Sequence, residues 1–186
     1  MAKRVCPWWI GCLLASPMRR WIAESPERLL APYVRAGMTV LEPGPGMGFF
    51  TLPLARLVGA TGRVVAVDVQ VKMLEGLRRR ATKASLAERI ERRIARPERM
   101  DLEDMQGTVD FVLAFAVVHE MPSAETFFAE AAGALKSGGL LFLAEPAGHV
   151  KAGEFQREVA AAEKTGLEVV SEPAVRRSHA AVLKKI

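Results

Sequence analysis

Three glycines at alternating positions give the clearest chemical signal in the sequence. They lie in the segment Glu42-Pro43-Gly44-Pro45-Gly46-Met47-Gly48, between a short apolar run at 39–41 and a run with helical spacing that starts at Phe49. Glycine lets the backbone turn tightly and approach a ligand, and a helix that starts directly afterwards adds N–H groups that can bind it. The Gly-x-Gly-x-Gly spacing is shorter than the Gly-x-Gly-x-x-Gly spacing of dinucleotide-binding loops, so it disfavours a nicotinamide cofactor.

Two carboxylates near this loop indicate which class of ligand it could bind. Glu42 ends the first apolar run two residues before the first glycine, where a carboxylate would repel a pyrophosphate and attract an ammonium group. Asp68 follows Gly48 by 20 residues, at the predicted end of a second strand, where a carboxylate reaches ribose hydroxyls. The pattern predicts a nucleoside site for a ligand with a cationic tail and no phosphate.

Two further polar residues follow predicted buried strands and are candidates for catalysis. His119 lies just beyond the apolar run 111–116, and Glu145 ends the run 140–144. Because ligands of doubly wound sheets bind at the carboxyl ends of the strands, both residues are expected at the same rim. His119 is interpreted either as a general base or substrate clamp, or as a residue whose hydrogen bond orients its loop.

No metal site is predicted. Cys6 and Cys12 do not have metal-ligand spacing, either between themselves or with His119. The other two histidines, His149 and His179, have no predicted role.

These residues must be positioned by alternating strands and helices. Continuous apolar runs predict buried strands, whereas the arginines in the third run predict an exposed edge strand. The helices are indicated by apolar residues at helical spacing, with Ser123 as a cap for one of them. The strands are expected at 39–41, 63–67, 90–95, 111–116, 140–144, 167–170 and 180–183, and the helices at 26–33, 49–57, around 73–77, 124–135 and 155–162.

This order predicts an α/β fold: a doubly wound, Rossmann-like, mostly parallel sheet with helices on both faces. The last two runs, 167–170 and 180–183, are separated by too few residues for a parallel crossover. They are therefore expected to pair antiparallel.

Length and composition agree with one such domain and a short appendage. The chain has 186 residues, of which 50% are hydrophobic and 25% are charged, which excludes wholesale disorder and a disulfide scaffold. The expected division is an N-terminal helical or lid segment at 1–32 and a ligand-binding domain at 33–186. Two cysteines without a disulfide pattern favour a reducing compartment, and a cytoplasmic location is expected.

The N-terminal segment has two competing interpretations. Its apolar run, 5–14, is too short to span a bilayer and is broken by Pro7, so neither export nor a transmembrane segment is predicted. Trp8 and Trp9 would serve either in a lid that covers the site or in peripheral contact with a membrane surface.

The basic residues are concentrated in one stretch. The net charge is +5, and residues 72–99 contain ten basic and four acidic side chains. Such a stretch is either a solvated surface or a docking face for phosphate, an acidic partner or anionic lipid.

Together, the glycine loop and its neighbours resemble a known family. Thr39 to Pro146 is similar to the class I S-adenosylmethionine-dependent methyltransferases, in the subgroup that includes the ubiquinone and menaquinone methylases. The resemblance rests on the complete Glu-x-Gly-x-Gly-x-Gly pattern, on Asp68, and on the segments Val118-His119-Glu120 and Lys136-Ser137-Gly138-Gly139. It implies a seven-stranded sheet whose last strand is antiparallel, and S-adenosylmethionine as cofactor with S-adenosylhomocysteine as product.

The resemblance also assigns roles to single residues. Glu42 would lie near the methionine amino group, Asp68 would bind the ribose hydroxyls, and Ala114 would face the cofactor. The adenine position, where the family often has an acid, falls at Arg96-Pro97, so backbone groups or Glu98 would have to serve there. The cofactor-binding residues expected in full are Glu42, Gly44, Pro45, Gly46, Gly48, Asp68, Val69, Gln70, Arg96, Pro97 and Ala114.

The expected activity is methyl transfer to a small-molecule acceptor, with His119 and Glu145 as candidate catalytic residues. The sequence lacks the Asn/Asp-Pro-Pro-Tyr/Phe motif of enzymes that methylate amino groups of nucleic acids; Ala114-Phe115-Ala116-Val117 stands in its place. Two alternatives stay open. One is methylation of RNA or protein docked on the basic 72–99 face, and the other is a catalytically silent domain that binds the cofactor or its product.

Overall fold

The computed structural model describes residues 25–186. Within them the chain forms two compact units, one covering residues 25–95 and the other Arg96–Ile186. The predictions for the segment 1–24, including the tryptophan lid, the membrane contact and the two cysteines, lie outside the described residues. Seven strands form one sheet in the order β3-β2-β1-β4-β5-β7-β6, with helices around it.

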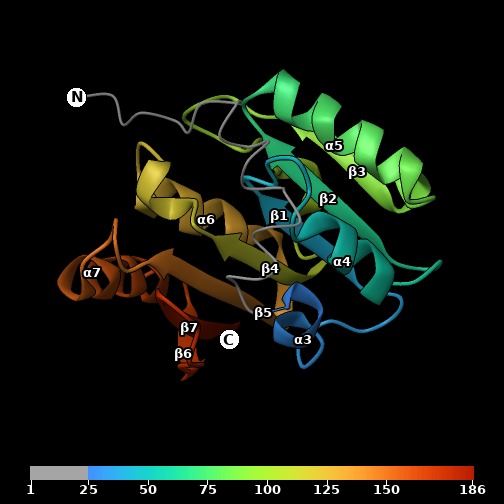
Figure 1. The fold of residues 1–186 in the computed structure, drawn as a ribbon. Coiled ribbons are helices and arrows are strands. Elements are labelled where there is room, and N and C mark those ends of the chain that lie inside the picture. Colours follow the sequence, from blue (N-terminus) through green and yellow to red (C-terminus); the bar gives the residue numbers. More distant parts are fainter. Residues whose placement is uncertain (1–24) are drawn as a thin grey trace. The chain divides into compact units, whose positions relative to one another are not determined.

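The first unit contains three parallel strands, β1 (Thr39–Pro43), β2 (Arg63–Asp68) and β3 (Ile90–Ile94). A short helix, α3 (Pro26–Leu30), precedes them, α4 (Thr51–Leu57) joins β1 to β2, and α5 (Val71–Lys83) followed by the 3₁₀ turn η1 (Ala87–Arg89) joins β2 to β3. The helix α5 packs on β2 and β3 through a buried stripe at helical spacing (Figure 1). Because β1 and β2 are parallel, Glu42 and Asp68 lie at the same edge of the sheet.

The second unit contains the other four strands. The parallel pair β4 (Val109–Phe115) and β5 (Leu135–Pro146) is followed by β6 (Leu167–Ser171) and β7 (Ser178–Lys185), and β7 runs antiparallel to both β5 and β6. The 3₁₀ turn η2 (Glu103–Met105) precedes β4, and between the strands lie the 3₁₀ turn η3 (Val118–Glu120) and the helices α6 (Ala124–Ala134) and α7 (Ala152–Glu163). Both helices pack on this part of the sheet and on each other (Figure 1).

The predicted fold class is confirmed: the sheet has seven strands, is mostly parallel, and ends with an antiparallel pair. The arginine-rich β3 is an edge strand, as its pattern indicated. The Ser123 hydroxyl accepts a hydrogen bond of 3.1 Å from the Thr126 N–H and so caps α6 as predicted.

Several boundaries differ from the prediction by a few residues, and among the strands the start of β5 differs most. The strand β5 begins at Leu135, five residues before the predicted start, and includes the expected Lys136–Gly139 turn. Its register with β4 shifts between Val109 and Phe111, and Gly138 has a φ of +78°. The glycines thus allow an irregular start to the strand, which local turn chemistry alone does not distinguish from a free loop. In the described part of the chain no helix is long and apolar enough to cross a membrane.

Candidate functional site

The glycine loop follows β1 directly and turns on left-handed residues. Gly44, Gly46 and Gly48 have φ values of +65°, +54° and +87°. Residues other than glycine adopt such positive φ values only with strain. The Gly44 N–H donates to the Val67 carbonyl of the neighbouring strand at 2.9 Å. A Cβ added at Gly46 would meet nothing within 4 Å. The loop therefore presents open space at its centre, where a ligand can approach the backbone.

The helix α5 holds this loop in place. The Arg80 guanidinium donates to the Met47 carbonyl at 2.5 Å. The Met47 side chain packs over Gly76, where an added Cβ would lie 3.0 Å from the Met47 Cγ. A Cβ at Gly48 would come within 2.6 Å of a methyl group of Leu77, so this glycine allows Leu77 of the same helix to pack closely against the loop.

The carboxyl group of Glu42, at the start of the loop, is buried and incompletely hydrogen-bonded. Its side chain is only 3% exposed, and among the described residues Oε2 has no hydrogen-bond partner, nor has the buried Thr51 hydroxyl. The pKa of Glu42 is raised to about 8, chiefly by burial; the nearby Thr51 hydroxyl lowers it, and the negative charge of Asp68 contributes to the increase. A buried carboxylate in this state is suited to a cationic partner.

Asp68 ends β2 beside the start of α5. Its side chain is buried, and Oδ1 accepts a 2.8 Å hydrogen bond from the backbone N–H of Gln70. This bond fixes the carboxylate at the turn, with Val69 and Gln70 half-buried next to it. The structure thus brings together Glu42, the glycine loop, Asp68, Val69 and Gln70 within one unit.

The remaining predicted residues belong to the second unit. Ala114 is fully buried in β4. Arg96 is exposed and forms an ion pair with Asp101, and Pro97 beside it is exposed. Nothing in their surroundings tests the cofactor contacts expected of these three residues, which stay predictions.

His119 and Glu145 form a hydrogen-bonded pair within this unit. The Ala116 backbone, with a φ of +56°, turns the chain out of β4 into the 3₁₀ turn that carries His119. The His119 Nδ1 lies 2.5 Å from Glu145 Oε2. The other oxygen, Oε1, accepts from the backbone N–H groups of Val118 at 2.7 Å and His119 at 3.3 Å. Glu145 is thus both fully buried and hydrogen-bonded through each oxygen.

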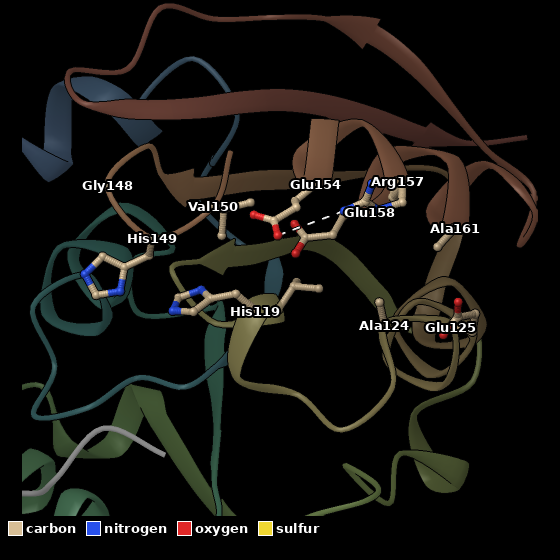
Figure 2. A pocket seen from close by; sticks show the side chains of 11 residues that line it. His119, Ala124, Glu125, Gly148, His149, Val150, Glu154, Arg157, Glu158 and Ala161 are labelled. Carbon is tan, nitrogen blue, oxygen red and sulfur yellow. Dashed lines mark ion pairs between the residues drawn. The ribbon is translucent and has the colours of Figure 1, made fainter. Parts of the chain in front are cut away.

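A cavity of about 600 Å³ opens beside this pair. Figure 2 shows the His119 ring next to that of His149, with the side chains of Glu154, Arg157 and Glu158 reaching in from α7. The two imidazole centroids are 5.8 Å apart. The cavity is lined by Val118, His119, Ala124, Glu125, Gly148, His149, Val150, Glu154, Arg157, Glu158 and Ala161.

Sequence reasoning missed most of this lining. The sequence indicates no role for His149, but this residue lies three positions after β5, which brings it to the end of the strand that carries Glu145. Glu154, Arg157 and Glu158 occupy one face of α7 at helical spacing. That spacing was visible in the sequence, but only the packing of α7 shows that the face borders a cavity. No cluster of three metal-ligating side chains exists within residues 25–186.

Several side chains of the basic stretch have partners within the protein. Arg80 and Arg89 donate to backbone carbonyls of Met47 and Ala55. Three further arginines form ion pairs with acids close in sequence, namely Arg93 with Glu91, Arg96 with Asp101 and Arg99 with Glu103. At least half of the ten cations counted in the sequence therefore have partners among the described residues.

The sequence also matches a known protein family. A family profile described as "Methyltransferase domain" matches residues 41–143, more than half of the chain. The chain belongs to this methyltransferase domain family. The matched region contains the glycine loop, Asp68, the turn that carries His119 and most of β5, so the predicted resemblance is confirmed.

Individual curated proteins share about a third of their residues with this chain, over part of its length. The ribosomal protein L11 methyltransferase of Pelotomaculum thermopropionicum is 35% identical over 117 residues, which are 61% of this chain and 34% of that protein. The ubiquinone biosynthesis O-methyltransferase of Paramagnetospirillum magneticum is 31% identical over 114 residues, 61% of this chain and 42% of that protein. The chain thus spans less than half the length of these curated relatives.

A solved structure matches the whole fold. The SAM dependent methyltransferase from Aquifex aeolicus aligns with a TM-score of 0.86 and 23% identity, and the alignment covers 98% of this chain and 100% of that one. At this identity the match shows that the two proteins share a fold.

Proposed function

We propose that the protein transfers a methyl group from S-adenosylmethionine to a small-molecule acceptor. The observation that carries this proposal is Glu42, a buried carboxylate whose Oε2 has no hydrogen-bond partner in the described chain, at the base of an open glycine loop. A buried polar atom without a partner costs free energy unless a ligand satisfies it. Membership of the methyltransferase domain family supports the same assignment.

The residues of the first unit fit the proposed cofactor. The Glu42 carboxylate would bind the ammonium group of its methionine part, and the Asp68 carboxylate would accept hydrogen bonds from the ribose hydroxyls. The open face of Gly46 would let the backbone lie against the ligand. When bound, S-adenosylmethionine supplies a methyl group already activated by a positively charged sulfur. The protein then needs mainly to orient the acceptor and exclude water.

A small acceptor is favoured over RNA or protein. The internal partners of Arg80, Arg89, Arg93, Arg96 and Arg99 reduce the number of cations that the 72–99 stretch can offer to a polyanion. The second unit contains a cavity of about 600 Å³ with polar side chains, a volume typical of small-molecule sites. Among the curated relatives, three are named for ubiquinone biosynthesis and one for a ribosomal protein.

Calorimetry with S-adenosylhomocysteine tests the cofactor site, and incubation with methyl-labelled S-adenosylmethionine and a mixture of small metabolites tests transfer. We expect saturable binding that Glu42→Gln weakens tenfold or more and that the exposed control Glu88→Gln leaves unchanged. Absence of binding to wild type overturns the proposal. Binding without transfer to any acceptor would instead favour a silent cofactor-binding domain.

A further inference from the structure

Two buried oxygen atoms beside the glycine loop have no hydrogen-bond partner among residues 25–186. They are Oε2 of Glu42, near the end of β1, and the hydroxyl of Thr51, the first residue of α4. Glu42 is 3% exposed and Thr51 is fully buried. Buried polar atoms of this kind are rare, because each costs free energy comparable to that of a lost hydrogen bond. Two of them beside one ligand loop point to a partner that arrives with the ligand.

The charges around Glu42 disfavour a carboxylate there. Within residues 25–95, the charge that acts on it is that of Asp68, at the end of the neighbouring strand β2. Arg56, the charged residue of α4, forms an ion pair with a residue of α3, and Arg80 of α5 donates to a carbonyl of the glycine loop. A buried carboxylate next to a like charge, without a cation as partner, takes up a proton. The pKa of Glu42 is accordingly raised to about 8, chiefly by burial, so the carboxyl is neutral at pH 7 unless a cation binds.

Thr51 acts on the same proton from α4. A hydroxyl can donate a hydrogen bond to a carboxylate or accept one from a neutral carboxyl. The Thr51 hydroxyl lowers the pKa of Glu42, which means that it favours the charged form. Thr51 and the four residues after it are all buried, so packing fixes its position beside the carboxyl. The hydroxyl therefore helps to set the pH at which Glu42 ionises.

We propose that Glu42 and Thr51 form a proton switch in the cofactor site: the Glu42 carboxyl stays neutral until the ammonium group of S-adenosylmethionine enters, then releases its proton while Thr51 donates to the carboxylate. This inference rests on the proposed function. It assigns to Thr51 the part of a positioning residue, which stabilises the carboxylate that the ammonium group meets. It also makes cofactor binding dependent on pH.

The exchange balances in atoms and in charge. The O–H bond of the Glu42 carboxyl breaks, its electron pair stays on the oxygen, and the proton passes to water. The ammonium group keeps its three protons and forms an ion pair with the carboxylate. One positive charge enters the buried site and one leaves it, so neither state contains an unpaired buried charge, which would be costly.

Calorimetry in two buffers counts the protons. The enthalpy of binding S-adenosylhomocysteine is measured at pH 7 in phosphate and in Tris, whose heats of ionisation differ. We expect wild type to release about one proton per ligand, because pH 7 lies below the pKa of about 8. Glu42→Gln should release none, and the exposed control Glu88→Gln should behave as wild type. Equal enthalpies of wild type in both buffers overturn the switch.

The affinity should follow the same proton. Below pH 8 the affinity of wild type for S-adenosylhomocysteine should rise about tenfold per pH unit, and above pH 8 it should level off. Glu42→Gln should show a nearly constant affinity between pH 6 and 9. An affinity of wild type that does not change over this range contradicts the proposal.

A ligand without the ammonium group tests which part of the cofactor displaces the proton. 5′-Methylthioadenosine keeps the adenosine and the sulfur but lacks the amino-acid part. We expect its binding to release no proton from Glu42 and to change little with pH. Proton release equal to that of S-adenosylhomocysteine overturns the assignment to the ammonium group.

Two substitutions separate the role of Thr51 from simple packing. Thr51→Val removes the hydroxyl at nearly constant volume, whereas Thr51→Ser keeps it. Because the hydroxyl favours the charged carboxyl, Thr51→Val should move the midpoint of the affinity curve to higher pH, and the affinity at pH 7 should fall severalfold. Thr51→Ser should keep the wild-type midpoint. A loss in Thr51→Val that is the same at every pH overturns the role of the hydroxyl.

Infrared difference spectroscopy reads the carboxyl directly. At pH 7 the band of a protonated carboxyl should disappear when S-adenosylhomocysteine binds to wild type, and Glu42→Gln should show no such loss. Binding that leaves this band in place overturns the switch but leaves the cofactor site standing. Failure of wild type to bind S-adenosylhomocysteine at any pH instead contradicts the proposed function itself.

Discussion

At the scale of single residues, Glu42 and Glu145 show how surroundings set the role of a buried carboxylate. Glu145 is hydrogen-bonded through both oxygens to groups of its own chain. Glu42 is buried with an oxygen that has no partner in the described residues, and its pKa is raised to about 8. The first arrangement holds a histidine in place, and the second favours a protonated carboxyl until a cation arrives.

The raised pKa of Glu42 predicts a stability that falls with pH. Between about pH 4.5 and 8 the folded state holds a proton on Glu42 that the unfolded state has lost, so the free energy of unfolding decreases by up to about 1.4 kcal/mol per pH unit. Above pH 8 this contribution is gone. Glu42→Gln should remove this component of the slope, as measured by urea unfolding at several pH values. An identical slope in wild type and variant would contradict the raised pKa, with Glu88→Gln as control.

Asp68 should contribute to cofactor affinity through charge-assisted hydrogen bonds. We expect Asp68→Ala to weaken binding of S-adenosylhomocysteine by about 1.5–3 kcal/mol, the range for losing such bonds. Because Asp68 also accepts from the Gln70 N–H, Asp68→Asn serves as the control that keeps an acceptor for that bond. NAD should not compete. Unchanged affinity of Asp68→Ala in calorimetry would remove this residue from the site.

At the scale of elements, the loop between β1 and α4 is shaped by two different requirements. Gly48 allows close packing, since a Cβ there would lie 2.6 Å from Leu77 on α5. Gly46 has open space beside its Cα, so its lack of a side chain serves no packing purpose. The helix α5 supports both positions, because Arg80 and Gly76 fix the intervening Met47.

This difference predicts that Gly46→Val loses cofactor binding but keeps the fold. The valine side chain would fill the open space in front of the loop, and its left-handed backbone would cost about 1–2 kcal/mol of stability. Gly107 is a matched control in the second unit, because it too has a positive φ, of +62°, and nothing within 4 Å of its added Cβ. Gly107→Val should lose similar stability in thermal unfolding and bind S-adenosylhomocysteine normally. Normal binding by Gly46→Val would place the cofactor elsewhere.

At the scale of the whole molecule, the net charge of +5 is not evidence for a nucleic-acid substrate. Many cations of the 72–99 stretch have internal partners. Arg78, Arg79 and Lys83 on the exposed side of α5 are candidates for a docking face. Non-specific contacts of such cations with phosphates weaken steeply with salt.

Replacing Arg78, Arg79 and Lys83 together by Glu tests the docking face. We expect transfer to a small acceptor and binding of S-adenosylhomocysteine to stay within about twofold of wild type, in both 50 mM and 300 mM salt, because none of these side chains belongs to the proposed sites. A hairpin RNA should bind only weakly to wild type and lose affinity steeply as salt rises. Methylation of the RNA that depends on these three cations would support the alternative substrate.

The order of the elements and the position of the glycine loop followed from local patterns. Continuous apolar runs mark buried strands, the arginines of 90–95 mark an edge strand, and the short separation of 167–170 from 180–183 forces an antiparallel pair. The glycine spacing with Glu42 and Asp68 indicated the family, since residues close in sequence make up that loop. Periodicity and turn chemistry are local properties, and a sequence displays them directly.

Only the tertiary structure decided which distant side chains meet. His119 and Glu145 are 26 positions apart, and both were candidates for catalysis, but their direct pairing depends on the parallel register of β4 and β5. The packing of α7 brings Glu158 and His149 to the same cavity as His119. Burial, and with it the raised pKa of Glu42, likewise depends on surrounding elements. Such contacts are set by packing between segments remote in sequence, which no local pattern records.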